Sequence, residues 1–247
     1  VYGGFHIIDV CKMFLERYCN ITNNQISFSR QQGSDFAKIV ADDFNPLHDA
    51  DAKRFCVPGD LLFSLVLEKS GLSQNMGFTF SGMVTDGIKL NFPEKIVESA
   101  SILDDNAKEY MKIEASGQCT TNRQSIDALI RAYVEFSGHT FPHILVKLMF
   151  EKNVMINPTR PMVMYENMFI HLDEVDFADV QLQLTTPSLL IDGKRGKATL
   201  PFDLVADGKV IGHGKKHMLL SGLRDYDQTT IDSLVNHYND KKAQYLK

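Results

Sequence analysis

A carboxylate and an imidazole occur close together in residues 43–48, which read Asp-Phe-Asn-Pro-Leu-His. Residues 36–40 place apolar side chains at helical spacing, and Asp43 continues the same stripe one turn later. A carboxylate on a core-facing position costs free energy unless it is hydrogen-bonded or used in chemistry. Pro46 must end the helix, so the chain can turn and bring His48 back towards Asp43. Such a pair can hold a water molecule and add or remove it by general acid–base catalysis.

A purely structural interpretation of the same segment is also open. Asp-x-Asn-Pro is a common way to end a helix, with Asn45 forming an Asx-turn through its own side chain. In that case His48 lies on the surface and does no chemistry. The two interpretations differ in whether His48 faces Asp43 or the solvent.

The elements expected around this segment follow the order helix then strands, twice, with a join near residue 138. Residues 59–70 and 143–152 are apolar on all sides, which is typical of buried helices. Strand-like patterns dominate residues 80–136 and return over residues 168–220. Because no helices separate these strands, antiparallel sheets are expected, and the fold class is α+β.

Local signals add detail to this outline. A capping box at residues 29–32 opens the helix that leads to the motif. Residues 126–136 are expected to be the last strand of the first run. Asp-Gly pairs at 192–193 and 207–208 predict hairpin turns. A helix over residues 231–246 is expected to close the chain.

Residues 43–48 resemble the hydratase motif of MaoC-like proteins, the (R)-specific enoyl-CoA hydratases of the hot-dog fold. Further along, residues 57–62 read Val-Pro-Gly-Asp-Leu-Leu, where that family has His-Gly-Met-Leu at the start of its central helix. The resemblance covers roughly residues 25–136, and the second half resembles a hot-dog unit only in its order of elements. The whole chain is also similar to a family of uncharacterised bacterial proteins that contain this motif.

The resemblance implies a double hot-dog, in which two antiparallel sheets each wrap a buried central helix. Residues 1–138 would form the half that carries the motif. Residues 139–247 would form a second half without it, ending in a helix. A chain of 247 residues has the length that two such modules need.

The resemblance also assigns roles to residues. It implies that Asp43 and His48 activate the water and deliver the proton, and that Asn45 braces the turn. The backbone N–H of Gly59, at the start of the central helix, would polarise the thioester carbonyl. Asn45, Gly59 and Asp60 are therefore the expected substrate-binding residues.

Two residues depart from the family pattern at the carbonyl-binding end. Pro58 replaces the family's histidine, and Asp60 replaces an apolar residue. A carboxylate in the first turn suits the helix dipole, yet it would repel an oxyanion that develops at the Gly59 N–H. We therefore expect an intact acid–base pair beside an altered carbonyl site.

The expected function is a hydratase or dehydratase, a lyase acting on an enoyl or 3-hydroxyacyl thioester of coenzyme A or acyl carrier protein. No metal or redox cofactor is expected. Two alternatives stay open, namely a non-catalytic acyl-thioester-binding protein and a hot-dog thioesterase. Two copies of the chain are expected to be able to form a homodimer.

The composition excludes other classes of partner. The formal net charge is −5, with 26 basic and 31 acidic side chains, and no basic run indicates nucleic acid binding. Four cysteines without metal-type spacing favour reduced thiols and a cytoplasmic protein. An amphipathic helix is expected over residues 8–18, and its charges do not fit a signal peptide. No stretch is long and apolar enough to span a membrane.

Three further features are expected to do no chemistry. Glu68 lies near the end of the expected central helix, which favours a surface position. Cys56 is expected to pack rather than react, because no basic partner is identifiable. His139 and His143 are four residues apart but lack a third ligand at metal spacing.

Overall fold

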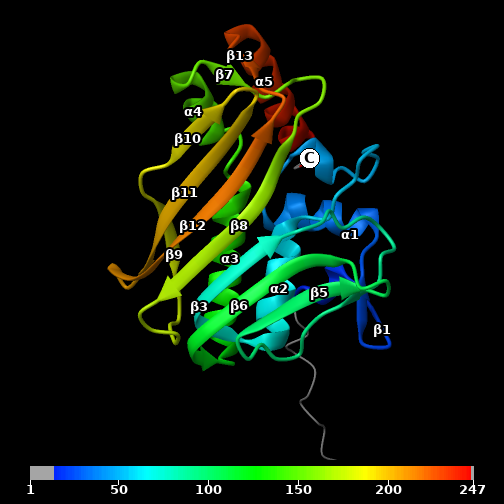
Figure 1. The fold of residues 1–247 in the computed structure, drawn as a ribbon, viewed down its shortest axis with the longest axis vertical. Coiled ribbons are helices and arrows are strands. Elements are labelled where there is room, and N and C mark those ends of the chain that lie inside the picture. Colours follow the sequence, from blue (N-terminus) through cyan, green and yellow to red (C-terminus); the bar gives the residue numbers. More distant parts are fainter. Residues whose placement is uncertain (1–13, 246–247) are drawn as a thin grey trace, which may run out of the picture.

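One antiparallel sheet of eleven strands runs through the molecule in the computed structural model, which describes residues 14–245 (Figure 1). In the order in which they pair, its strands are β1 (Asn20–Thr22), β2 (Gln25–Ser27), β4 (Leu90–Asn91), β5 (Ser99–Asp104), β6 (Glu109–Thr120), β3 (Leu72–Phe80), β8 (Val163–Leu172), β12 (Lys209–Ser221), β11 (Arg195–Ala206) and β10 (Ser188–Asp192), with β9 (Gln181–Leu184) paired to β11. A separate two-stranded sheet pairs β7 (Val154–Met155) with β13 (Arg224–Asp225). The predicted α+β class with antiparallel strands is confirmed.

The two strand runs meet where β3 pairs with β8, with Gly77 opposite Phe169. The expected two sheets are therefore one continuous sheet. The cause is that each run presents one strand edge to the other, and the ladder hydrogen bonds of these edges satisfy each other. The division of the chain at residue 138 stays a prediction.

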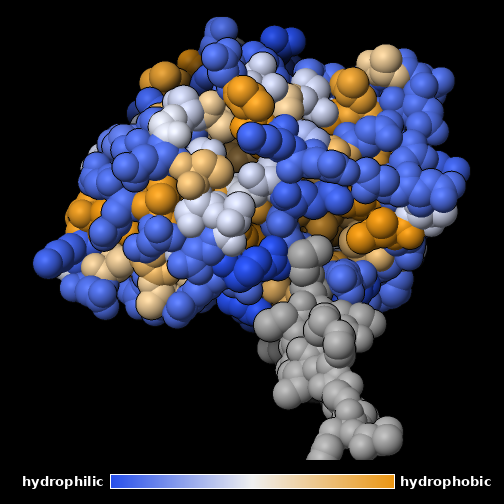
Figure 2. Space-filling view, turned by 90° about the horizontal axis from the view of Figure 1, so that it is seen from below, coloured by the Kyte–Doolittle hydropathy of each residue, from blue (hydrophilic) through white to orange (hydrophobic). Residues whose placement is uncertain are grey.

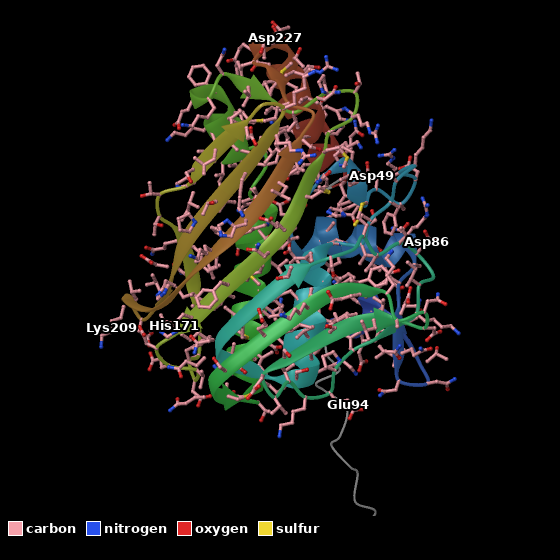
Figure 3. The ribbon with its side chains drawn as sticks, viewed as in Figure 1. Asp49, Asp86, Glu94, His171, Lys209 and Asp227 are labelled. Atoms are coloured by element: carbon pink, nitrogen blue, oxygen red, sulfur yellow. The ribbon has the colours of Figure 1, made fainter. Side chains whose placement is uncertain are left out.

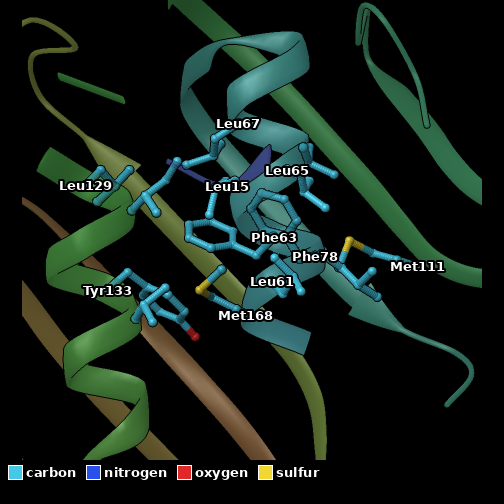
Figure 4. Packing of buried hydrophobic residues seen from close by; sticks show 14 of the residues in the cluster. Leu15, Leu61, Phe63, Leu65, Leu67, Phe78, Met111, Leu129, Tyr133 and Met168 are labelled. Atoms are coloured by element: carbon cyan, nitrogen blue, oxygen red, sulfur yellow. The ribbon is translucent and has the colours of Figure 1, made fainter. Parts of the chain in front are cut away.

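The central helix of the first half is α2 (Gly59–Ser70), and it is buried as predicted. Figure 4 shows Leu61, Phe63, Leu65 and Leu67 of α2 packed among side chains from the sheet and from a second helix. Each of these four side chains is at most 2% exposed. Full burial of such a side chain stabilises the fold by roughly 1.5–3 kcal/mol.

The second helix on this face is α3 (Arg123–Gly138), which replaces the strand predicted at 126–136. Asn122 caps it, because its side chain accepts a hydrogen bond from the backbone N–H of Gln124 at 3.0 Å. The buried apolar side chains of α3 follow helical spacing and are Ile126, Leu129, Ile130, Tyr133 and Val134. The strand prediction was wrong because it gave the β-branched and aromatic residues of this segment more weight than their helical spacing.

The helix predicted at 143–152 is short and lies away from the first core. It is α4 (Leu145–Glu151), and it packs in a second hydrophobic cluster with β10, β11 and β12. One side of α4 faces solvent, since Phe150 is 62% exposed. The prediction that 143–152 is a second central helix is therefore wrong, and α3 packs beside α2 instead (Figure 1).

Several local predictions are confirmed. Ser29 and Gln32 form the capping box at the start of α1 (Arg30–Asp35). The turns at 192–193 and 207–208 join β10 to β11 and β11 to β12. The chain ends in α5 (Gln228–Tyr245). Of the helix predicted over 8–18, residues 8–13 lie outside the described residues, and Glu16–Tyr18 form a 3-10 turn, η1.

The surface in Figure 2 is mostly hydrophilic, and its apolar residues form small separate patches. This matches the enclosure of α2 and α3 by the sheet and the loops around it. None of the helices in residues 14–245 is long and apolar enough to cross a membrane.

Candidate functional site

A mostly apolar cavity of about 410 Å³ is lined by segments that are far apart in the sequence. Its wall includes the 43–48 segment, the first turn of α2, the end of α3, strands β8 and β12, and helix α5. All five predicted site residues line this cavity, namely Asp43, Asn45, His48, Gly59 and Asp60. Their roles remain predictions, but the structure brings the five residues together.

The helix that leads to Asp43 ends earlier than expected. After α1, residues Phe36–Val40 form one π-helical turn, η2. Ile39 is 55% exposed, so the predicted apolar stripe of residues 36–40 is wrong at this position. The extra residue in a π-turn rotates the side chains that follow it, and Asp43 reaches the cavity from the loop rather than from the helix.

The loop after η2 is held by backbone hydrogen bonds. Asp42 adopts the left-handed conformation with φ 52°, which aspartate tolerates better than most residues. The backbone N–H of Asp43 then donates to the carbonyl of Ala37 at 2.8 Å. On the other side, Gly138 of α3 passes so close that an added Cβ would lie 1.6 Å from the Ala41 carbonyl oxygen. Only glycine allows α3 to end against this loop.

Asn45 forms the Asx-turn that the structural interpretation expected. Its side-chain oxygen accepts a hydrogen bond from the backbone N–H of Leu47 at 3.1 Å. The backbone N–H of Asn45 donates to Oδ1 of Asp43 at 2.9 Å. This turn starts the 3-10 helix η3 (Pro46–His48) and directs His48 inwards. Asn45 therefore braces the turn, and His48 does not lie on the surface.

His48 is fixed at one ring nitrogen and faces Asp43 with the other. Its Nδ1 lies 2.7 Å from the carbonyl oxygen of Cys56, and since a carbonyl only accepts, Nδ1 carries the proton. Its Nε2 lies 3.8 Å from Oδ2 of Asp43. The His48 side chain is 14% exposed and the Asp43 side chain 24% exposed. An oxygen atom at about 2.8 Å from both groups can bridge them from one side of the line that joins them.

Burial raises the pKa of Asp43 above its ordinary value. The nearby Asp60 carboxylate acts in the same direction. His48, the backbone N–H of Asn45 and the ammonium of Lys216 lower the pKa, but they do not outweigh burial. A carboxyl group with a raised pKa is better suited to exchange protons near neutral pH than an exposed one.

The first turn of α2 forms another part of the wall. Pro58 occupies the N-cap position of α2, and among the described residues its side chain makes no hydrogen bond to the first turn. The α-carbon of Gly59 lies against the ring of Phe80, since an added Cβ would be 2.8 Å from a ring atom. Asp60 is buried, and its Oδ2 accepts a hydrogen bond from the Ser137 hydroxyl at 2.6 Å.

Sequence reasoning missed Ser137 and Lys216, which line the same cavity. The Lys216 ammonium donates to the Ser137 hydroxyl, which itself donates to Asp60. Lys216 alternates with outward residues on β12 and shares its face with Gly214 and Met218, both buried. A lysine at an inward position of an alternating strand is the sequence signal that would have found it.

Helix α5 fastens the motif loop from outside. The Tyr238 hydroxyl donates to the Asp42 carbonyl at 3.0 Å and lies 3.4 Å from the backbone N–H of Phe44. Lys242 forms an ion pair with Asp42, and Lys241 pairs with Asp49, which is labelled in Figure 3. The C-terminal helix therefore completes the cavity wall and holds the loop that carries Asp43.

With the fold and the cavity described, comparison with known proteins places the chain in a family. A family model described as "Protein of unknown function (DUF3581)" matches residues 13–229. The chain belongs to the DUF3581 family. No curated protein matches the sequence of this DUF3581 protein.

Solved structures give only distant likenesses to the DUF3581 protein. An acyl-CoA thioesterase II TesB2 from Mycobacterium marinum is 8% identical with a TM-score of 0.40, over 87% of this chain and 99% of that chain. A MaoC-like dehydratase is 9% identical with a TM-score of 0.39, over 81% of this chain and 97% of that chain. An acyl-ACP thioesterase from Bacteroides thetaiotaomicron is 9% identical with a TM-score of 0.34, over 66% and 90%. Likenesses of this size carry no argument about activity.

Glu68 of the DUF3581 protein is not on the surface, so that prediction is wrong. Its side chain is 1% exposed and forms an ion pair with Arg123 at 3.1 Å. Burial raises the pKa of Glu68 to about 7, although Arg123 opposes the shift. Glu68 sits near the far end of α2 and does not line the cavity.

The cavity wall of the DUF3581 protein also contains the thiol of Cys56. Burial raises the pKa of the Cys56 thiol to about 11, which makes it a poor nucleophile at neutral pH. Within residues 14–245, no group of three or more His, Cys, Asp or Glu side chains is arranged to hold a metal ion. The carboxyl, imidazole and amino groups that line the cavity belong to Asp43, Asp60, His48, His237 and Lys216. Asp43 and His48 face each other among them.

Proposed function

We propose that this protein is a hydratase or dehydratase of an enoyl or 3-hydroxyacyl thioester, carried by coenzyme A or acyl carrier protein. The proposal includes a double hot-dog fold of the MaoC-like type. The observation that carries it is the pair formed by Asp43 Oδ2 and His48 Nε2, 3.8 Å apart in the wall of a mostly apolar cavity. That spacing admits one oxygen atom, and the cavity can take an acyl chain.

In the hydration direction, the water oxygen lies between Asp43 and His48. One of the pair takes a proton from the water while the water oxygen bonds to C3 of the enoyl thioester. The electrons of the C2–C3 double bond move towards the thioester carbonyl and form an enolate. The pair then returns one proton to C2, so that the elements of water are added across the double bond. Dehydration is the reverse sequence of the same steps.

The same pair supports a second candidate function. A water activated by Asp43 and His48 can attack the thioester carbonyl carbon instead of C3, which would release a carboxylic acid and a free thiol. The 3.8 Å separation that admits the water does not choose between the two carbon atoms. The position of the carbonyl relative to the pair decides the outcome, so a thioesterase is the alternative. A protein that binds the thioester without turnover is the other alternative.

One assay separates these functions. Enoyl thioesters of several chain lengths, on coenzyme A and on acyl carrier protein, are mixed with the protein. Loss of the conjugated double bond is followed by ultraviolet absorbance, and free thiol is measured in the same sample. A hydratase removes the double bond without releasing thiol. Thiol release in equal amount to the loss of absorbance supports the thioesterase, because hydrolysis also destroys the enoyl-thioester chromophore. Thioester binding without either change supports the binding protein, and an absence of binding to every substrate contradicts all three.

A further inference from the structure

Lys216 is a buried lysine in the wall of a cavity that is otherwise mostly apolar. It is 3% exposed, whereas lysine is almost never fully buried unless it is paired. Its ammonium donates to the Ser137 hydroxyl and lies 4.4 Å from the centre of the Tyr165 ring. An ammonium held over an aromatic ring gains a cation–π interaction that strengthens when water is absent.

Asp60 is the counter-charge of Lys216, and Ser137 links the two. The Ser137 hydroxyl accepts from Lys216 and donates to Oδ2 of Asp60 at 2.6 Å. Oδ1 of Asp60 is buried and has no hydrogen-bond partner among residues 14–245. Nothing in the proposed proton transfers between Asp43 and the substrate uses this network. The unused oxygen of Asp60 can only accept. The ammonium of Lys216 has three N–H donors and makes one hydrogen bond among residues 14–245, which leaves donors for an acceptor on a ligand.

The position of this network relative to Asp43 suggests its role. Lys216 and Asp60 are both close enough to Asp43 for their charges to act on its pKa. An enolate formed at the thioester would place negative charge on the carbonyl oxygen. Asp60, in the first turn of α2, would repel that charge if it stood alone. Lys216, linked to Asp60 through the Ser137 hydroxyl, supplies a positive charge in the same cavity wall.

We infer that Lys216 donates a hydrogen bond to the thioester carbonyl oxygen and stabilises its negative charge during the reaction. The Ser137 hydroxyl and the Tyr165 ring hold the ammonium in place before the substrate binds. Such preorganised charge in a cavity that excludes water is the main source of oxyanion stabilisation in enzymes. In this arrangement the Gly59 N–H is a secondary donor. Burial lowers the pKa of Lys216, and the Asp60 and Asp43 carboxylates oppose this shift and favour the charged ammonium. The inference rests on the proposed acyl-thioester substrate.

The test reads carbonyl polarisation, which does not require turnover. A saturated acyl-coenzyme A, labelled with ¹³C at the thioester carbonyl, is bound to the protein and its carbonyl stretch is measured by isotope-edited infrared spectroscopy. A donor to the oxygen lowers the stretching frequency below its value in solution. We expect this shift in the wild type and in Lys215→Met, and we expect its loss in Lys216→Met. Lys215 is the matched control because it is exposed and adjacent on β12.

Removing Lys216 leaves the Asp60 carboxylate buried and unpaired, which would destabilise the fold. The double variant Lys216→Met/Asp60→Asn removes both charges and keeps the test usable if the single variant does not fold. We expect the double variant also to lack the infrared shift. On an enoyl thioester, loss of Lys216 should lower kcat by about 10² to 10³-fold with a much smaller change in KM, as for other oxyanion donors.

The outcomes separate this inference from the proposed function. If hydration occurs and the double variant keeps both the shift and the rate, the role of Lys216 is overturned and the hydratase stands. If the shift depends on Lys216 but no hydration occurs, the carbonyl contact stands and the hydratase falls. If no acyl-coenzyme A binds to the wild type, both are overturned.

Discussion

Burial decides the protonation of Glu68. Glu68 is paired with Arg123, yet its pKa is raised to about 7 because the cost of burying its charge exceeds the gain from the pair. Arg123 is 48% exposed on its side chain, so solvent weakens its attraction for Glu68. The fold therefore holds a proton on Glu68 at pH values where an unfolded chain would release it.

This raised pKa predicts how stability changes with pH. Between pH 4.5, the ordinary pKa, and about 7, the folded state keeps a proton that the unfolded state has lost. The free energy of unfolding should fall as the pH rises through this window, by at most about 1.4 kcal/mol per pH unit from this group. Chemical denaturation across the window should give a flatter dependence for Glu68→Gln than for the wild type. The exposed Glu98→Gln should behave as the wild type, and equal slopes in all three proteins would contradict the assignment.

At the scale of residues, the sequence predicts one side of the site and misses the other. Asp43 and His48 are five positions apart, so turn chemistry alone indicates that they can meet. The Asx-turn of the structural interpretation is present, but it directs His48 inwards towards Asp43 and not onto the surface. Ser137 lies 77 positions along the chain from its hydrogen-bond partner Asp60, and Lys216 lies 79 positions from its partner Ser137. No local pattern encodes such a meeting.

The element that brings these groups together is the end of α3. Gly138 lets α3 stop directly against the loop after η2, with Ser137 beside it and facing the cavity. An added Cβ at Gly138 would overlap the Ala41 backbone carbonyl, which cannot rotate away as a side chain could. The position of the Asp43 loop relative to α3 therefore depends on this glycine.

A Gly138→Ala substitution should lower stability and disturb the site. Overpacking against backbone typically costs about 1–3 kcal/mol. We expect a lower free energy of unfolding and a lower affinity for acyl thioesters. Gly77→Ala is the matched control, because its added Cβ would make only ordinary contacts at 3.8 Å. Thermal unfolding of the two variants checks this. Equal melting temperatures for Gly138→Ala and Gly77→Ala would contradict the close contact between α3 and the Ala41 carbonyl.

Elements with a single, strong pattern were predictable. The all-apolar run of α2 indicated a buried helix, and the Asp-Gly pairs indicated hairpin turns. The helix α3 was missed although its apolar residues follow helical spacing from an Asn122 cap. The pairing of β3 with β8 could not be predicted, because strand edges find their partners through the tertiary fold rather than through local pattern.

At the scale of the whole molecule, the cavity belongs to both halves. Asp43, His48 and Asp60 come from the first strand-and-helix run, while Lys216 and Tyr238 come from the second part of the chain. The motif occurs once in the sequence, so one complete site is expected in each chain.

Ligand titration tests this count. A non-hydrolysable acyl-coenzyme A analogue should saturate near one equivalent per chain in isothermal titration calorimetry. The same stoichiometry is expected if two copies form the predicted homodimer, since each cavity is closed by its own α5. Two equal sites per chain would contradict the expectation that the second half has no chemistry of its own.

The most direct test of the account is the rate of hydration in variants of the acid–base pair. Asp43→Asn and His48→Gln should fold as the wild type and each lose about 10² to 10⁴-fold in turnover of an enoyl thioester. The double variant should lose little more than either single variant, because the two groups act on one water. Asp51→Asn, an exposed residue beyond the motif, should retain full activity. Hydration that persists in both single variants at the wild-type rate would contradict the account.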